Sequence, residues 1–321
     1  MRIACLQFNP ELGRLPENIA RANALLEAAS PQNIDLLVLP ELAFTGYNYP
    51  SFSSILPHLE PTASGPSTNW ARATASRLNC IVTVGYPELC TPPPASSTKT
   101  QDLSPAGEAI AYNSTVTVSP TSQILAHYRK THLYYTDETW AQESPSGWLS
   151  TSLTFAPKTC PERGVRANFG ICMDLNPHKF EAPWEAYEFA SHALASGSEL
   201  LVLSMAWLTG LDALELAAHA EEPDLSTLSY WVGRLKPLVE AEKEVIAVFG
   251  NRCGQEAGKN PLGVEEGVRY AGSSWIGKVG NGVVKIWDIM GRAEEGVVVA
   301  DTEKEPKWAL RLQSRDKELA E

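Results

Sequence analysis

The stretch VRANFGICMD, residues 165–174, places a largely apolar segment directly before a cysteine and an aspartate. We predict a β-strand from Val165 to Ile171, because its apolar residues form a short run of strand length. Cys172 then follows the last residue of that strand. In α/β proteins, reactive side chains lie at the ends of strands, so this thiol is the first candidate for a catalytic group.

Strand-like and helix-like segments alternate on both sides of this stretch. We predict strands at residues 1–8, 36–39, 80–85, 112–118, 124–128, 165–171, 200–205, 245–249, 270–276, 283–286 and 297–300. Apolar residues repeat with the helical period at residues 16–29, 67–78, 184–195 and 228–241, where we predict helices. The alternation indicates one α/β domain over residues 1–321, in which helices cover the sheets.

Two segments interrupt this pattern. Residues 91–107 are rich in Pro, Ser and Thr, whereas residues 209–225 are acidic and less regular. We predict that both are insertions at the surface and that neither is a linker between domains.

The composition limits the classes of function. The chain has 321 residues, 44% of them hydrophobic, which is enough for a large core. Its formal net charge of −12 disfavours nucleic acid as a partner, because the phosphates would be repelled. No apolar run is long enough to span a bilayer, and the N-terminal segment turns polar at Asn9, too early for a signal peptide. We therefore expect no membrane partner and a cytoplasmic location, with the nucleus as an alternative.

The cysteines give no sign of a metal site. They stand at positions 5, 80, 90, 160, 172 and 253, without a Cys-x-x-Cys pair or histidines at ligand spacing. Without a secretory signal they are expected to be reduced thiols. We predict that the protein needs no metal and no other cofactor.

Two charged residues upstream complete a set that suits a cysteine hydrolase. Glu41 follows the predicted strand 36–39, and Lys130 follows the predicted strand 124–128. A cysteine with a pKa of ~8.5 is mostly protonated at neutral pH, so it needs a base before it can attack an amide or nitrile carbon. The carboxylate would accept the thiol proton, while Lys130 and the Met173 amide N–H would hold the oxyanion. Each residue alone has an ordinary structural alternative, and the prediction depends on their joint occurrence.

These residues lie in three signatures that occur in chain order: LPEL at 39–42, RKTHL at 129–133 and GICMD at 170–174. With them the sequence resembles the nitrilase, or carbon–nitrogen hydrolase, superfamily over nearly its whole length. The resemblance implies an α-β-β-α sandwich. It also implies a triad in which Glu41 is general base and acid, Lys130 stabilises charge, and Cys172 is the nucleophile that forms a thioester.

The resemblance further implies a second glutamate about eight residues after the lysine, which here is Glu138. It would orient Lys130 and the substrate. Glu143 is a competing candidate, and a solvated loop acid is the structural alternative for Glu138. His132 and His178 also permit a papain-like Cys-His pair, but His132 belongs to the lysine signature and His178 has no evident acidic partner.

Three more segments are similar to the fungal protein N-terminal asparagine amidohydrolase branch: FTGYNY at 44–49, LYYTDE at 133–138 and CMDLNP at 172–177. This similarity implies an amidohydrolase that converts N-terminal Asn, and Gln, of polypeptides to Asp or Glu with release of ammonia. Such a reaction belongs to the N-degron degradation pathway.

A substrate of this kind presents an α-ammonium group close to the reacting carboxamide. We expect Asp174 or Glu138 to pair with that cation, and Tyr47, Trp140 and Trp207 to line the pocket. The alternative for Asp174 is a structural hydrogen bond that holds the turn at the nucleophile. The alternative for the three aromatic residues is a place in the core.

Two other functions stay open. One is a small-molecule amidase, ω-amidase or carbamoylase of the same superfamily, and the other is a catalytically silent scaffold. The presence of Glu41, Lys130 and Cys172 argues against a silent protein, since a decayed site would have lost one of them. The superfamily resemblance also suggests a homodimer, and the preference between Asn and Gln is not readable from the sequence.

Overall fold

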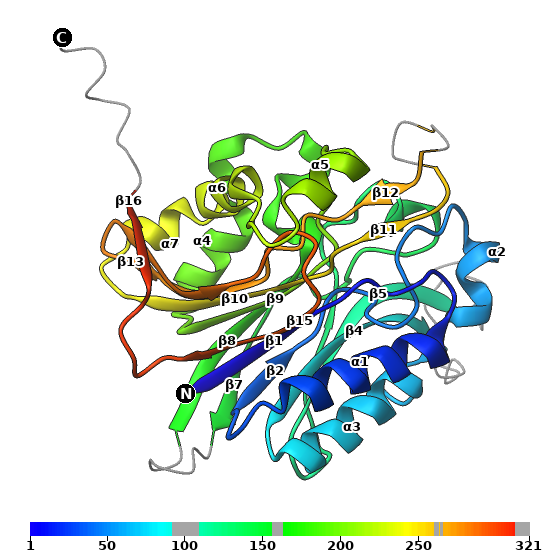
Figure 1. Ribbon diagram of the computed structural model, residues 1–321, viewed down its shortest axis with the longest axis horizontal. Coiled ribbons are helices and arrows are strands. Elements are labelled where there is room, and N and C mark those ends of the chain that lie inside the picture. The colour runs from blue at the N-terminus through cyan, green and yellow to red at the C-terminus, as the bar shows by residue number, and fades with distance from the viewer. Residues whose placement is uncertain (92–108, 156–162, 260–262, 264–265, 312–321) are drawn as a thin grey trace, which may run out of the picture.

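The computed structural model describes residues 1–91, 109–155, 163–259, 263 and 266–311. Within these ranges, two seven-stranded sheets pack face to face and helices cover both outer faces (Figure 1). The predicted α-β-β-α sandwich is therefore confirmed. The insertion predicted at 91–107 lies outside the described residues apart from Thr91. No helix in the described ranges is long and apolar enough to cross a membrane.

The first sheet contains the strands found in residues 1–129 and one strand from near the C-terminus. Its order is β15 (Gly296–Asp301), β1 (Arg2–Gln7), β2 (Leu36–Val38), β4 (Ile81–Cys90), β5 (Ile110–Val118) and β6 (Ile124–Arg129), and β3 (Glu60–Pro61) pairs with β4. β1, β2 and β4 are parallel, whereas β4, β5 and β6 form an antiparallel meander. The strand that precedes Glu41 and the strand that precedes Lys130 thus belong to one sheet.

The second sheet contains the strand that precedes Cys172. Its order is β16 (Trp308–Arg311), β14 (Val283–Ile289), β13 (Trp275–Gly280), β10 (Val245–Asn251), β9 (Leu200–Met205), β8 (Arg163–Ile171) and β7 (Leu149–Phe155). β8, β9 and β10 are parallel. A separate two-stranded ladder joins β11 (Gln255–Glu256) to β12 (Val268–Arg269).

Helices form the two outer layers. α1 (Leu15–Ala29) and α3 (Pro66–Leu78) cover the first sheet, and α4 (Glu188–Ala195), α6 (Leu225–Arg234) and α7 (Lys236–Glu240) cover the second (Figure 1). Shorter elements lie in the connections: α2 (Phe52–Ile55), α5 (Ala213–Ala218), η1 (Leu56–His58), η2 (Asp137–Thr139), η3 (Cys172–Leu175), η4 (His178–Phe180) and η5 (Trp184–Ala186).

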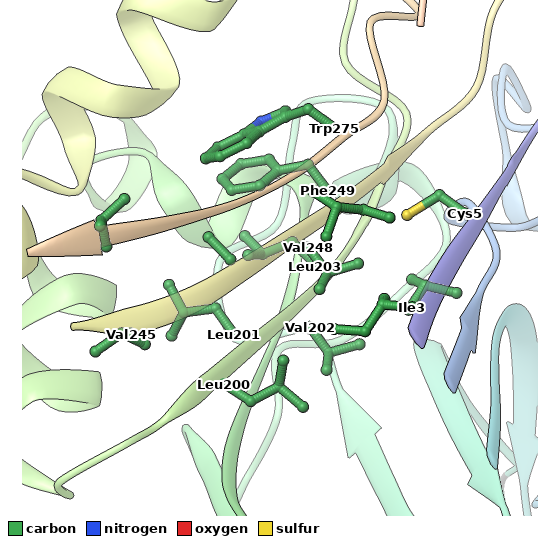
Figure 2. Close-up of a cluster of buried hydrophobic side chains, with 14 of the residues drawn as sticks. Ile3, Cys5, Leu200, Leu201, Val202, Leu203, Val245, Val248, Phe249 and Trp275 are labelled. Atoms are coloured by element: carbon green, nitrogen blue, oxygen red, sulfur yellow. The ribbon is translucent and has the colours of Figure 1, made fainter. Parts of the chain in front are cut away.

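The core between the sheets holds the strand ends together. Apolar side chains of β1 and β2 pack there against those of β8, β9 and β10. Figure 2 shows Ile3 and Cys5 of β1 pointing toward side chains of β9 and β10 such as Val202 and Val248. Burial of each large apolar side chain contributes about 1.5–3 kcal/mol, so this layer is the main force that brings the two sheets together.

Two predicted helices are interrupted in the structure. The segment 184–195 forms η5 and then α4, because Tyr187 between them has a left-handed φ of 42°. The segment 228–241 belongs to α6 and α7, which meet at Leu235. Pro237 lies in the first turn of α7, where it starts a helix readily but removes a hydrogen bond that one continuous helix would need.

The predicted strand at 270–276 is displaced in the structure. β13 begins only at Trp275, because Gly272 and Ser273 have positive φ values of 51° and 57° and break the extended conformation. β7 and β16 were not predicted. The region 209–225, predicted as a surface insertion, contains α5 and ends at the first residue of α6.

Candidate active site

The ends of three strands bring Glu41, Lys130 and Cys172 together. Lys130 Nζ lies 2.6 Å from Glu41 Oε1, and both side chains are completely buried. The charges of Glu41 and Lys130 both act on the pKa of Cys172, whose side chain is 8% exposed. The two sheets also meet here through the backbone, because the Glu41 N–H donates to the Met205 carbonyl at the end of β9. The structure therefore assembles the three residues that the sequence selected.

The turn at Glu41 depends on a close backbone approach. Leu42 has a left-handed φ of 45°, and the Ala43 N–H donates to the Gly85 carbonyl on β4 at 3.0 Å. A Cβ atom on Gly85 would lie 2.8 Å from the Cα of Glu41 and 2.7 Å from the Leu42 nitrogen. Glycine is thus needed at residue 85 so that the carboxylate can turn into the site.

Lys130 is held as a cation by two carboxylates. Its Nζ donates to Glu41 and to Asp137. Burial alone would lower the pKa of Lys130, but the negative charges of Asp137 and Glu41 outweigh burial and raise that pKa. Asn113 on β5 joins the network, donating to Glu41 at 2.7 Å and to Asp137 at 3.0 Å. The ammonium is therefore rigidly placed before any substrate binds.

Glu41 has the properties of a general base and acid near neutral pH. Burial raises its pKa to about 7, with Asp137 adding to the rise and Lys130 and Asn113 opposing it. Its Oε1 atom accepts the hydrogen bonds from Lys130 and Asn113, while Oε2 has no hydrogen-bond partner among the described residues. Oε2 is thus the oxygen available for proton transfer.

The surroundings of Cys172 favour the protonated form of its thiol. Burial and the negative charge of Glu41 raise its pKa, and these effects exceed the opposing effects of Lys130 and the Ala206 amide. Cys172 has a left-handed φ of 38°, an unfavourable conformation for a non-glycine residue, as often found at functional sites. The thiol consequently needs a base for activation, and Glu41 supplies one.

Asp174 fixes the turn that carries the nucleophile. It is fully buried, and its carboxylate accepts hydrogen bonds from the backbone N–H groups of Ile171, Thr131 and His132 and from the Tyr128 hydroxyl, at 2.7–3.0 Å. These donors come from the strand before Cys172 and from the segment after Lys130. The protein itself occupies both oxygens of Asp174, which supports the structural alternative over pairing with a substrate cation.

A cavity of about 480 Å³ opens next to the nucleophile. It is lined by Tyr47, Tyr134, Cys172, Met173, Asn176, Phe180, Ala206, Trp207, Leu208, Thr209, Gly210, Asp224, Ser226, Thr227 and Tyr230. Phe180 is 45% exposed, so the rim reaches solvent. The volume and the aromatic lining are typical of a site for a small ligand or the end of a peptide.

The chain is similar to known proteins. The model of the family described as carbon-nitrogen hydrolase matches residues 2–176. A relative from Schizosaccharomyces pombe, called protein N-terminal amidase, is 33% identical over 319 residues, covering 95% of this chain and 100% of that protein. The chain belongs to the carbon–nitrogen hydrolase family. It is accordingly a hydrolase that acts on the carbon–nitrogen bonds of amides.

Other likenesses agree with this family. A protein N-terminal amidase from Saccharomyces cerevisiae is 31% identical over 221 residues, covering 65% of this chain and 45% of that protein. Crystal structures of an N-terminal amidase with a Gln-Gly peptide and with an Asn-Glu peptide have TM-scores of 0.77 and 0.76 and 21% identity. Each comparison covers 93% of this chain and 96% of the other. At that identity the structural likeness shows a shared fold.

In this carbon–nitrogen hydrolase, Asp137 takes the position predicted for Glu138. The turn η2 directs Asp137 inward, where it contacts Lys130 and also accepts the Tyr134 N–H at 3.0 Å, while Glu138 is exposed. The competing candidate Glu143 pairs with His178 near the surface. The structure thus places the neighbouring residue, Asp137, where Glu138 was expected. Successive side chains in a 3-10 turn point about 120° apart, so the spacing alone does not show which neighbour faces inward.

The two histidines do not form a Cys-His pair. His132 is buried, with Nδ1 3.0 Å from the Asn176 carbonyl and its ring packed edge-on against Trp148. The His178 Nε2 lies 2.8 Å from Glu143. These contacts support structural roles for both rings.

The predicted pocket residues separate into two groups. Tyr47, Trp207 and Met173 line the cavity of this family member. Trp140 does not line it; it is buried in a core cluster that also contains Tyr47 and Leu133. The sequence did not separate them, since an aromatic residue suits a core and a pocket equally.

Sequence reasoning missed several residues of the site. From the sequence, Asn113 is only one residue of the predicted strand 112–118, and Glu138 is selected in place of its neighbour Asp137. Asp224 is not among the predicted site residues, because region 209–225 is predicted as a surface insertion. A signal was present: Asp224 precedes the apolar helix 225–234, and aspartate at that point is a common helix cap. In the described ranges, no group of three His, Cys, Asp or Glu residues could hold a metal ion.

Proposed function

We propose that this protein deamidates the side chain of N-terminal Asn and Gln residues of polypeptides, releasing ammonia. The observation that carries the proposal is the likeness to the S. pombe protein N-terminal amidase, which extends over that protein's full length at 33% identity. The cavity supports it, because its rim at Phe180 reaches solvent and leaves a way out for the rest of the chain.

The first half of the reaction forms a thioester. The Oε2 atom of Glu41 accepts the thiol proton of Cys172, and Sγ bonds to the carboxamide carbon while the carbonyl π electrons move to oxygen. Lys130 and the Met173 N–H stabilise this oxyanion. When the intermediate collapses, the C–N bond breaks, Glu41 returns the proton to the leaving nitrogen, and ammonia departs.

The second half of the reaction restores the enzyme. Glu41 takes a proton from a water molecule, whose oxygen bonds to the thioester carbon. The C–S bond then breaks, and the proton on Glu41 returns to the sulfur of Cys172. The product is an N-terminal Asp or Glu. A base with a pKa of about 7 suits both directions of proton transfer.

We place this reaction in the N-degron pathway, in the cytoplasm or nucleus, as an early step in degradation signalled by the N-terminal residue. A homodimer stays a prediction.

The decisive experiment compares ammonia release from an Asn-initiated peptide, the same peptide N-acetylated, a peptide with an internal Asn, and free asparagine and glutamine. We expect rapid ammonia release only from the Asn-initiated peptide and from the matching Gln-initiated peptide. Equal rates on the acetylated and free peptides would reject the N-terminal specificity while leaving a general amidase. Highest rates on free amides would favour an ω-amidase or another small-molecule amidase. No turnover of any substrate would support a silent scaffold.

A further inference from the structure

The cavity beside Cys172 holds a single carboxylate among its described lining residues. That residue is Asp224, and no Lys, Arg or His side chain lines the same cavity. Lys130 is fully buried outside this lining and is already paired with two acids. The net charge that a ligand meets on the cavity wall is therefore negative.

The two oxygens of Asp224 are used differently. Oδ1 accepts three hydrogen bonds, from the N–H and hydroxyl of Ser226 and from the N–H of Thr227, at 2.6–3.1 Å. Oδ2 accepts a longer hydrogen bond from Thr209 at 3.3 Å, which leaves lone-pair capacity for a ligand. The Asp224 N–H donates to the Ser273 hydroxyl at 2.8 Å, so the residue is anchored on both sides.

Asp224 carries its charge in this setting. Burial, with 5% of the residue exposed, would raise its pKa, but hydrogen bonds from Ser226, Thr227 and Thr209 outweigh burial and lower that pKa below its usual value. All of these partners are neutral. A buried, ionised carboxylate without a cationic partner on its cavity side suits a positively charged ligand group.

We propose that Asp224 binds the α-ammonium group of the substrate and thereby restricts the reaction to amides at a chain N-terminus. This inference rests on the proposed function and names the residue that would give it specificity. The α-nitrogen and the carboxamide carbon are separated by three bonds in Asn and four in Gln. Asp224 and Cys172 line one cavity of about 480 Å³, so both side chains face a ligand that occupies it.

A purely structural role for Asp224 makes a different prediction. Asp224 is the N-cap of α6, and loss of a cap would weaken the helix whatever the substrate. Asparagine caps helices about as well as aspartate but has no charge. Asp224→Asn therefore removes the proposed ionic contact and keeps the cap.

The test pairs this variant with a matched substrate. The first substrate is an Asn-initiated peptide, and the second is the same peptide with a 3-carbamoylpropanoyl group in place of Asn, which lacks only the α-amine. Wild-type enzyme should prefer the first by about 100-fold or more in kcat/KM. Asp224→Asn should lose most of that preference, chiefly through a higher KM for the first substrate.

Asp212→Asn is the control. Asp212 caps the exposed helix α5 with the same type of hydrogen bonds but does not line the cavity, so the preference should stay at the wild-type value. If Asp224→Asn lowers kcat/KM equally for both substrates, or keeps the full preference for the first, Asp224 does not bind the ammonium. If wild-type enzyme itself shows no preference, the proposed function fails, which is a separate result visible before any variant is made.

Discussion

The buried charged groups near the nucleophile and the acid on the cavity wall differ in how far the protein satisfies its own polar groups. We call the first set, Asp174, Lys130 and Asp137, the floor of the site; none of them lines the cavity, whereas Asp224 does. On the floor, the carboxylate of Asp174 accepts four hydrogen bonds from its surroundings, and Lys130 is shared between two acids. On the wall, Asp224 keeps one oxygen that receives only a long contact from Thr209 among the described residues. The two aspartates thus have the same chemistry but different availability.

This difference separates positioning from recognition. A saturated acid such as Asp174 holds the strand end of Cys172 against the segment after Lys130, and its loss should harm every substrate alike. Loss of an acid whose oxygen can still accept a hydrogen bond should instead change the preference of the enzyme between substrates. Variants on the floor are therefore expected to lower kcat, whereas variants on the wall are expected to alter KM and discrimination.

The largest effect is expected at the nucleophile. Cys172→Ala, and Cys172→Ser, should reduce ammonia release by at least about 10³-fold because no other group can form the covalent intermediate. Thermal unfolding should be almost unchanged, since the side-chain volume is nearly preserved. Cys90→Ser, at the end of β4, serves as the control and should keep full activity. Retention of more than a few per cent of activity in Cys172→Ala would remove this residue from the nucleophilic role.

Lys130→Arg should be almost as damaging as Lys130→Ala, with kcat lowered by about 10²–10³-fold. The buried space between Glu41 and Asp137 fits a compact ammonium, and a planar guanidinium would place its charge elsewhere. Steady-state kinetics measure the loss. Lys307→Arg, at an exposed ion pair, is the control and should be neutral. Activity of Lys130→Arg within about fivefold of wild type would contradict a precise role in holding the oxyanion.

Asp174→Asn should lower kcat by about 10–100-fold and the free energy of unfolding by about 1–3 kcal/mol, because an amide group would face N–H donors that now meet a carboxylate. The loss should be equal for the free-amine peptide and for its analogue without the amine. Parallel kinetics on both substrates and chemical denaturation measure these effects. A selective loss on the free-amine peptide would place Asp174 in recognition and erase the contrast with Asp224.

The pH dependence should report on Glu41. Its pKa is raised to about 7, and it must be deprotonated to accept the thiol proton, so kcat/KM should fall about tenfold per unit as the pH drops below that value. The groups that act on Glu41 are Lys130, Asp137 and Asn113. A profile of ammonia release from about pH 5 to about pH 9 tests this. A constant kcat/KM between about pH 7 and about pH 5 would contradict a general base with this raised pKa.

The smallest effect is expected at Glu138, the exposed residue next to Asp137. Glu138→Gln should change kcat/KM by less than about twofold, because the side chain is exposed and Lys130 contacts Asp137 instead. Asp137→Asn is the matched comparison and should lower kcat by at least about tenfold. If the two variants behaved in the opposite way, the assignment of the second acid would return to Glu138.

The sequence by itself determined the layered α/β fold and the three strand ends that carry Glu41, Lys130 and Cys172. Apolar runs and helical periodicity are local patterns, so they indicate which segments are strands or helices without knowledge of their partners. A cysteine, a glutamate and a lysine at the ends of such runs could be selected for the same reason. The displaced start of β13 shows the limit of this information, because left-handed residues at 272 and 273 interrupt an otherwise strand-like segment.

Only the tertiary structure decided which acid does what. Asp137, Glu138, Asp174 and Asp224 are all carboxylates near turns in the sequence, and their roles depend on which donors the folded chain brings to each oxygen. The donors to Asp174 come from residues more than forty positions upstream as well as from its own turn. Asp224 lines the cavity as the N-cap of α6, where Thr209 and Ser273 from other parts of the chain contact it. Hydrogen-bond saturation is a property of three-dimensional neighbours, and a linear pattern does not contain it.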